Sequence, residues 1–410
     1  MTYLSAIYII GPRDVLKETV GKIPQLVGLF ECEVVKGNSL LRKLLSKLII
    51  RVALASLKPR LASWRYQRGR RSLLENLTGK SEHVDIVEEI AVEDYNDEVD
   101  EVMEDVIETL LTGLCDRDTT VRWICAKGIG RIASRLDFEL ADQIVASVIE
   151  LLEQDVIYGD DGQIDVSGVN DGVWHGACLA LAELSRRGLL LPPRLKEVVP
   201  WTIVALFFEQ RRGHFSIGSH IRDSACFVLW SFARAYNADV LTPFALELSK
   251  ALLIASITDR EIHVRRAAAA AFQENAGRHG LFPHGISVVT TADYFSLGNI
   301  GNVYSEIALK LMEFDVYRTD ITNHISKFSL IHWDKNMRAL AAKSLGLQAL
   351  KFPETNIVNT LSNVVKLCTS GDFGERHGYL LGVSYITTGL FQSGTIRWGD
   401  HISLQDVLLA

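Results

Sequence analysis

The sequence predicts an all-α fold assembled from stacked helical repeats, and two regularities of the chain lead to this prediction. One is an apolar stripe at helical spacing that returns many times along the 410 residues. The other is an acidic residue four positions before an arginine, which stands at the start of most of these stripes. A short helical unit that recurs at a nearly constant interval cannot bury its apolar face alone, so neighbouring copies must stack.

Apolar stripes mark the helices that repeat. From Val121 to Leu136 the apolar residues follow the i, i+3, i+4, i+7 spacing, which predicts an amphipathic helix of about four turns. The same spacing recurs in helices that begin at four later positions, which are Val173, Ile221, Val264 and Met337. The last interval, 73 residues, is too long for one unit. We therefore expect a further copy over 303–314, and a weaker final copy near Arg376.

A second set of helices is predicted between the first, with examples over 140–152, 195–208 and 244–257. Two helices in each period of about 40 to 47 residues are typical of HEAT and armadillo repeats. We therefore predict an all-α, HEAT/armadillo-type α-solenoid superhelix.

The acid-to-arginine spacing has a structural interpretation that we favour over a catalytic one. We expect the acid to cap the helix that follows it, and the arginine to reach the acid of the neighbouring repeat, so that the pairs form a ladder between repeats. The residues assigned to this inter-repeat role are Asp118 and Arg122, Glu261 and Arg265, Asp334 and Arg338, Asp372 and Arg376, and Arg222, which lacks its acid.

Charge is distributed unevenly near the N-terminus. Eleven basic residues and one acid lie over 42–80, whereas thirteen acids and no Lys or Arg lie over 82–108. We interpret 1–81 as an N-terminal helical region with a basic segment, 82–100 as an acidic linker, and 101–410 as the repeat array.

Two segments are candidates for binding a partner. The basic segment carries Arg60, Trp64, Arg65, Tyr66 and Arg68, and Arg, Trp and Tyr dominate the energetics of protein–protein interfaces. A long loop predicted over 277–301 carries Phe282, His284, Asp293, Tyr294 and Phe295. The alternative for both segments is that the aromatic side chains pack on the array and the charged ones are merely solvated.

Composition and motifs exclude several classes of function. A net charge of −7 argues against nucleic acid as the main partner, and the apolar stretch over 40–57 is broken by charges that a membrane span would not carry. The sequence has no phosphate-binding loop, no nucleophile elbow and no histidine or cysteine spacing typical of a metal site. We therefore expect no catalytic residues, no metal, no cofactor and no enzyme activity. Six scattered cysteines favour the reducing cytosol.

Several strings of the sequence resemble the tubulin-folding cofactor D family. They extend over nearly the whole chain, from about residue 7 to about 390, and the longest runs from Arg265 to Phe295. The others are Leu57–Gly69 (LKPRLASWRYQRG), Asp118–Leu136 (DTTVRWICAKGIGRIASRL), Trp174–Leu191 (WHGACLALAELSRRGLLL) and Arg222–Tyr236 (RDSACFVLWSFARAY). Since family chains are much longer, this chain resembles a middle segment of them; 158–172 and 392–410 depart from the family pattern.

The resemblance implies a cytoplasmic tubulin-specific chaperone, with microtubules or centrosomes as further locations. It implies binding of β-tubulin, a part in folding, assembly and disassembly of the α/β-tubulin heterodimer, and joint action with cofactors E and C and a small Arf-like GTPase. Activation of GTP hydrolysis is implied only in complex with the other cofactors, and no catalytic arginine can be carried onto a numbered position. A HEAT-repeat scaffold or importin-like transport adaptor remains the alternative.

The basic segment supplies a first prediction. If Arg65 and Arg68 contact the partner, the double substitution Arg65→Glu, Arg68→Glu will weaken capture of β-tubulin from cytosol and leave the helix content unchanged. Pull-down and circular dichroism measure the two quantities. A loss of helix content would show instead that the segment is structural.

Overall fold

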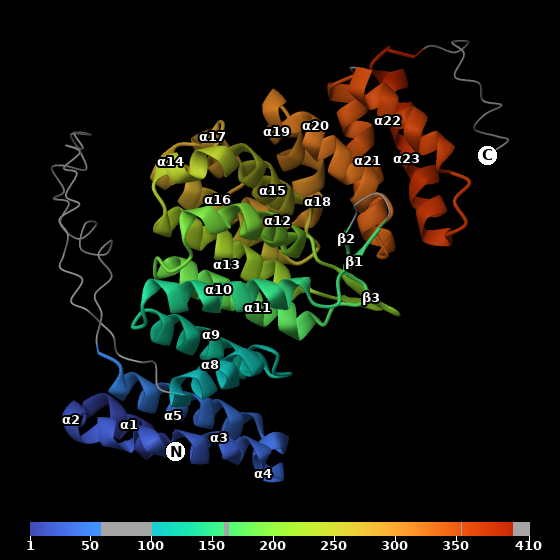
Figure 1. The fold of residues 1–410 in the computed structure, drawn as a ribbon. Helices are drawn as coiled ribbons and strands as arrows, with labels where there is room; N and C mark the ends of the chain where they lie inside the picture. Colours follow the sequence, from blue (N-terminus) through green and yellow to red (C-terminus); the bar gives the residue numbers. More distant parts are fainter. Residues whose placement is uncertain (59–100, 160–163, 354, 397–410) are drawn as a thin grey trace, which may run out of the picture. The chain divides into compact units, whose positions relative to one another are not determined.

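The computed structural model describes residues 1–58, 101–159, 164–353 and 355–396, and Figure 1 traces them in sequence colours. These residues are mostly helical and divide into two compact units, 1–202 and 203–410. The predicted boundaries at 81 and 100 and the acidic linker lie outside the described residues. The prediction of an all-α HEAT/armadillo-type solenoid is confirmed.

The first unit begins with short helices that lead into α5 (Ser39–Ser56). They are α1 (Thr2–Ile10), α2 (Arg13–Leu16), η1 (Lys17–Lys22), α3 (Ile23–Gly28), η2 (Leu29–Glu31) and α4 (Glu33–Gly37). The unit continues through α8 (Glu101–Leu114), α9 (Thr119–Ala133), α10 (Phe138–Glu153), α11 (Asp171–Arg186), η3 (Pro192–Arg194) and α12 (Leu195–Leu206), within which the division between the units falls. Helices α5, α9 and α11 pack side by side, while α8 and α10 pack against them as the second helix of each pair (Figure 1).

The second unit repeats this arrangement. Its first layer contains α13 (Ser219–Ala235), α16 (Ile262–His279), η6 (Val303–Ile307) with α19 (Ala308–Leu311), α21 (Lys335–Lys351) and α23 (Phe373–Gln392). The partner helices are α14 (Ala238–Leu241), η4 (Thr242–Phe244), α15 (Ala245–Thr258), α17 (Gly285–Thr291), η5 (Ser296–Gly298), α20 (Asp315–His324), η7 (Ile325–Ser329) and α22 (Thr355–Lys366), while α18 (Ile300–Asn302) leads directly into η6. Contacts between α13 and α16, and between α21 and α23, are the most extensive in this unit.

The apolar stripes lie in the core, as their spacing indicates. Val121, Ile221, Val264 and Met337 are buried, and the further copy expected over 303–314 exists as η6 and α19, with Val303 buried. The cysteines on the stripes, Cys125, Cys178 and Cys226, are also buried. Burial raises the pKa of the Cys125 thiol to about 12.

Two connections between helices contain short β-hairpins. Strands β1 (Ile157–Tyr158) and β2 (Ile164–Asp165) pair antiparallel, as do β3 (Gln210–Arg212) and β4 (Phe215–Ile217). The segment over 277–301 is not the long loop we expected, because α16 extends to His279 and α17, η5 and the start of α18 occupy most of the remainder.

One segment within the described residues is long and apolar enough to cross a membrane. It spans 238–258, where α14, η4 and α15 run on, and its mean hydropathy is 1.6. In this structure 61% of it is buried inside the protein, and α15 packs on α16 and α20. The core helix of a soluble protein can have the same length, apolar composition and burial. The absence of a membrane span therefore stays a prediction from the sequence.

Glycines set how closely two first-layer helices approach the ends of elements in the partner layer. A Cβ placed on Gly176 in α11 would overlap the carbonyl oxygen of Leu114, and a Cβ on Gly378 in α23 would overlap that of Leu330. Both glycines stand at the same place, the sixth residue of their helices. At these two points, backbone meets backbone without a side chain between.

The substitution Gly176→Ala is therefore expected to lower the free energy of unfolding by about 1–3 kcal/mol, because α11 and the end of α8 must move apart. The matched control is Gly277→Ala in α16, where a Cβ would meet nothing within 4 Å. This control should raise stability by roughly 0.5–1 kcal/mol through lower backbone entropy in the unfolded state. Urea denaturation compares the two; equal effects would contradict the close approach.

Candidate functional site

An arginine is the fourth residue of six first-layer helices. These arginines are Arg42, Arg122, Arg222, Arg265, Arg338 and Arg376, and all but Arg376 are buried. Because the guanidinium group keeps its charge at any ordinary pH, a buried arginine needs acceptors for its N–H groups. For each buried arginine the structure supplies two kinds of acceptor: a backbone carbonyl that precedes the arginine's own helix, and a group in the next repeat.

One acceptor is a backbone carbonyl in the turn just before the arginine's own helix. The Nη1 atom of Arg122 donates to the carbonyl of Asp116 at 2.6 Å, and that of Arg338 to the carbonyl of His332 at 2.7 Å, in both cases six residues back. Arg42, Arg265 and Arg376 make the same contact with Lys36, Asp259 and Ser370. Arg222 reaches fourteen residues back, to Phe208, because the β3–β4 hairpin is inserted in its turn.

The other acceptor belongs to the next repeat. Nε of Arg42 donates to Asp116 at 2.7 Å, and Nε of Arg222 donates to Asp259 at 2.6 Å. The remaining buried arginines have neutral acceptors: Nε of Arg122 donates to Nδ1 of His175 at 2.9 Å, Nε of Arg265 to the carbonyl of Leu297 at 3.0 Å, and Nε of Arg338 to Nδ1 of His377 at 3.2 Å.

The ladder therefore differs from our expectation in its partners. Asp118, Asp334 and Asp372 accept backbone N–H groups at the start of their helices, whereas Glu261 makes no such bond. None of these four carboxylates accepts from a ladder arginine of a neighbouring repeat, although Asp334 pairs with Arg260 at 3.2 Å. The acids that pair with ladder arginines, Asp116 and Asp259, stand two residues earlier than Asp118 and Glu261. The backbone carbonyl of each of these two earlier aspartates is also the acceptor in the turn, and its side chain lies against the preceding repeat.

Electrostatics separates two kinds of arginine in this series. The hydrogen bond to Asp116 raises the pKa of Arg42, and at Arg222 burial lowers the pKa but the charge of Asp259 more than offsets it. Where the acceptors are neutral, burial prevails and lowers the pKa of Arg122. Burial of the arginine thus does not require a charged partner, but it does require hydrogen-bond acceptors for the guanidinium N–H groups.

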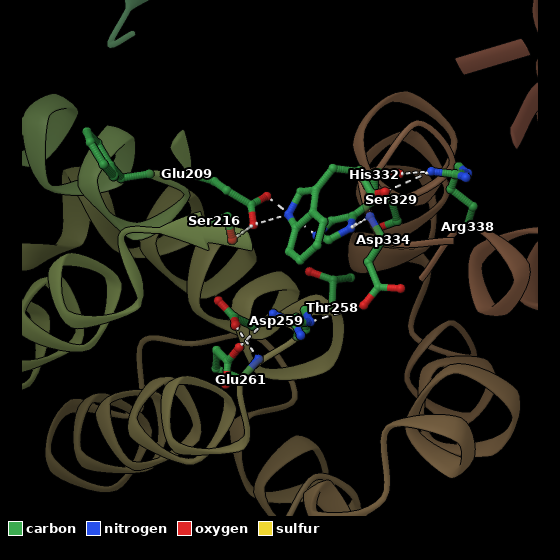
Figure 2. A network of polar contacts seen from close by, with 12 residues as sticks. Glu209, Ser216, Thr258, Asp259, Glu261, Ser329, His332, Asp334 and Arg338 are labelled. Carbon is green, nitrogen blue, oxygen red and sulfur yellow. Dashed lines mark hydrogen bonds and ion pairs between the residues drawn. The ribbon is translucent and has the colours of Figure 1, made fainter. Parts of the chain in front are cut away.

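A second polar network lies in the second unit, around Glu209, which directly precedes β3. Figure 2 shows Glu209 and Ser216 facing the turn before α21, where His332 and Asp334 lie. Oε1 of Glu209 accepts from Nε1 of Trp333 at 2.9 Å and from Oγ of Ser216 at 2.7 Å. Nε2 of His332 lies 3.5 Å from Oε2 of Glu209.

The carboxylate at the centre of this network is ionised. Burial alone would raise the pKa of Glu209, but His332, Trp333 and Ser216 outweigh it and lower the pKa to about 2. Nδ1 of His332 accepts the backbone N–H of Asp334 at 2.9 Å, so in the neutral ring the proton is on Nε2, facing Glu209. Ser216 and His332 both contact the carboxylate instead of each other, which is not the order of a catalytic triad.

The residues predicted to bind a partner have different positions. Arg60, Trp64, Arg65, Tyr66 and Arg68 lie outside the described residues. Phe282 was a wrong choice, since it is 5% exposed and packs edge-on against Phe272 with ring centroids 5.0 Å apart. His284 stacks on Phe314 at 4.5 Å, and Asp293 accepts the backbone N–H groups of Phe295 and Ser296.

Tyr294 and Phe295 are the members of that group that face solvent. They are 57% and 83% exposed, and their ring centroids lie 5.5 Å apart. Arg266 in α16 holds the pair: its guanidinium lies 3.8 Å from the Tyr294 ring centroid and donates to both the carbonyl and the hydroxyl of Tyr294 at 3.1 Å. An exposed aromatic pair fixed by an arginine is suited to contact with another protein.

The sequence did carry signals for some residues that we missed. Arg42 follows Asn38 at the ladder spacing, but Asn38 is not an acid. Asp116 and Asp259 each precede a ladder acid by two residues. For Glu209 and Trp333, which are 124 residues apart, no local pattern exists.

The buried arginines give a test of the ladder. Arg222→Leu should lower the free energy of unfolding by about 3–5 kcal/mol, because it leaves Asp259 as a buried charge without its partner. Arg376→Leu changes the same helix position where the arginine is exposed, and is expected to stay within about 0.5 kcal/mol of the unsubstituted chain. Denaturation midpoints of the two variants decide; a small effect at Arg222 would contradict a structural role for the pair.

Comparisons with known proteins agree on one family. Residues 40–286 match the family described as tubulin-specific chaperone D-like, ARM repeats. Over 286 residues the chain is 41% identical to tubulin-specific chaperone D of Dictyostelium discoideum, covering 69% of this chain and 19% of that relative. Over 389 residues it is 30% identical to tubulin-folding cofactor D of Schizosaccharomyces pombe, covering 94% of this chain and 34% of that relative.

Solved structures are more distant. Yeast importin-β (Kap95p) aligns with 94% of this chain and 46% of its own at 14% identity, with a TM-score of 0.37, which is too low to carry an argument. The chain spans about a fifth and about a third of the length of the two relatives it matches. Because the family match covers more than half of the chain, this protein belongs to the tubulin-specific chaperone D-like family of ARM-repeat proteins.

Proposed function

We propose that this chain is a tubulin-binding segment of a chaperone that holds β-tubulin during assembly and disassembly of the α/β-tubulin heterodimer. The observation that carries the proposal is the family match over 40–286, together with two relatives whose names state a role with tubulin. Since the chain spans only part of those relatives, the activity of the whole protein is part of the proposal.

The proposal extends to location and partners. The chain works in the cytoplasm, with microtubules and centrosomes as places where its tubulin partner is found. Tubulin-folding cofactors E and C and a small Arf-like GTPase act with it. GTP hydrolysis on tubulin is stimulated only in that complex, so the chain itself is not an enzyme. The Glu209 network supports this view because its serine and histidine are arranged as hydrogen-bond donors to one carboxylate.

Tyr294 and Phe295 are the proposed contact for β-tubulin in the described part of the chain, and the basic segment with Arg65 and Arg68 is a second contact outside it. Aromatic side chains that are already held in place lose little rotamer freedom on binding, which favours affinity. Arg266 supplies that restraint for Tyr294. The neighbouring acid, Asp293, accepts backbone N–H groups of the same turn, so its main role is to stabilise that turn and not to contact the partner.

The double substitution Tyr294→Ala, Phe295→Ala is expected to weaken capture of β-tubulin by about tenfold or more, as for residues at the centre of an interface. Phe138→Ala serves as the matched control, because Phe138 is 60% exposed at the start of α10 in the other unit. Pull-down of tubulin from cytosol by the tagged 410-residue chain measures both. If the chain recovers other cytosolic cargo and no tubulin, the proposal is wrong; equal capture by both variants would remove only this surface.

A further inference from the structure

A cleft of about 370 Å³ opens in the second unit between the end of α20 with η7 and the face of α22. Asn323 and Lys327 line one wall, Asn363 and Lys366 line the other, and Val364 and Tyr379 contribute to the floor. Its size is within the usual range of small-ligand sites. Neither the ladder nor the Glu209 network includes any of these residues.

Four of the polar side chains in the walls have no partner among the described residues. Within the described residues, the ammonium groups of Lys327 and Lys366 form no ion pair, and the side-chain amides of Asn323 and Asn363 form no hydrogen bond. The wall segments 321–331 and 355–366 contain no Asp or Glu. Two positive charges therefore face a space without a nearby counter-charge in either wall, a setting that attracts anions.

Tyr379 adds a further polar group to the cleft. It is only 7% exposed, yet across the described ranges its hydroxyl has no hydrogen-bond partner. Buried tyrosines elsewhere in this unit are satisfied: Tyr304 bonds to Thr258 and Ser329 at 3.1 Å, and Tyr317 to the carbonyl of Pro283 at 2.7 Å. The Tyr379 hydroxyl is not among the buried polar atoms that lack a partner, so it is open to the cleft and available to a ligand.

The hydroxyl is available as a donor. Burial, with smaller contributions from Glu375 and Cys368, raises the pKa of Tyr379, so the phenol keeps its proton. Glu375 is the one acid that acts on it, and its carboxylate accepts from Oγ of Ser370 at 2.6 Å. The cleft therefore presents two ammonium groups, two amides and a phenolic O–H.

We propose that this cleft binds an acidic peptide segment, with a carboxylate side chain between Lys327 and Lys366 and within reach of the Tyr379 hydroxyl. A peptide is favoured over an isolated phosphate for two reasons. The amides of Asn323 and Asn363 each offer a donor and an acceptor, which complement a peptide backbone. The walls hold no guanidinium fork, the group best matched to phosphate, and Val364 offers apolar surface to the methylene groups of a glutamate.

The test uses the full chain and a fluorescent peptide of alternating glutamate and glycine, read by anisotropy, with a glutamine–glycine peptide for comparison. Binding of the glutamate peptide is expected to weaken about tenfold in Lys327→Glu, Lys366→Glu, since each surface charge contact contributes modestly. Lys343→Glu makes the same charge change on an exposed lysine of α21 and should leave binding unchanged. Tyr379→Phe keeps the ring and removes only the hydroxyl, so it should weaken binding about threefold to tenfold.

The inference goes beyond the proposed function and does not depend on tubulin, so each can fail alone. Equal binding of the glutamate and glutamine peptides would overturn it, as would equal effects at Lys343 and at the cleft lysines. Displacement of the peptide by an equal concentration of inorganic phosphate would show a general anion site and overturn the choice of a peptide. Circular dichroism confirms folding of each variant, and Tyr379→Phe decides if the lysine variant is unfolded.

Discussion

A buried arginine at the fourth position of five first-layer helices is the interaction on which these repeats depend. Its guanidinium joins two places at once: the turn carbonyl six residues earlier, and an acceptor in the next repeat. The turn is itself fixed by the residue that supplies this carbonyl. The side chains of Asp116, Asp259 and His332 each accept the backbone N–H two residues on. Turn, helix start and neighbouring repeat are therefore held by one set of hydrogen bonds, and loss of the arginine leaves several buried acceptors unsatisfied.

Asp259 shows how one rung is joined to the next. Its carboxylate takes the ion pair with Arg222 of the preceding helix, while its carbonyl accepts from Arg265 of its own helix. A change at this residue would thus affect two arginines, whereas a change at Glu261, which has no capping bond, affects neither in the same way. Because Asp259 contacts both arginines, the acids four residues before each arginine contribute less to the contacts between repeats than we expected.

The helices could be predicted from the sequence because burial at helical spacing is a local property of the chain. The arginines were found by the same means, except Arg42, whose helix is capped by Asn38 instead of an acid. Their partners could not be predicted, because backbone carbonyls leave no mark in the sequence and the side-chain acceptors vary between aspartate and histidine. Which aromatic side chains are exposed could not be predicted either: Phe282 and Phe295 lie in one segment, but Phe282 packs on Phe272 and is buried, whereas Phe295 is exposed.

The ladder also positions the proposed contact surface. Arg265 and Arg266 are consecutive, and they hold consecutive parts of one turn: Arg265 donates to the carbonyls of Leu297 and Gly298, and Arg266 to Tyr294. The first arginine points into the core and the second along the surface, since neighbouring residues of a helix lie about 100° apart. The exposed pair of Tyr294 and Phe295 is therefore attached to the same helix turn that joins two repeats. A partner bound to that pair would contact a turn that Arg265 and Arg266 already fix to α16. A rigid scaffold presents a binding loop in the same way.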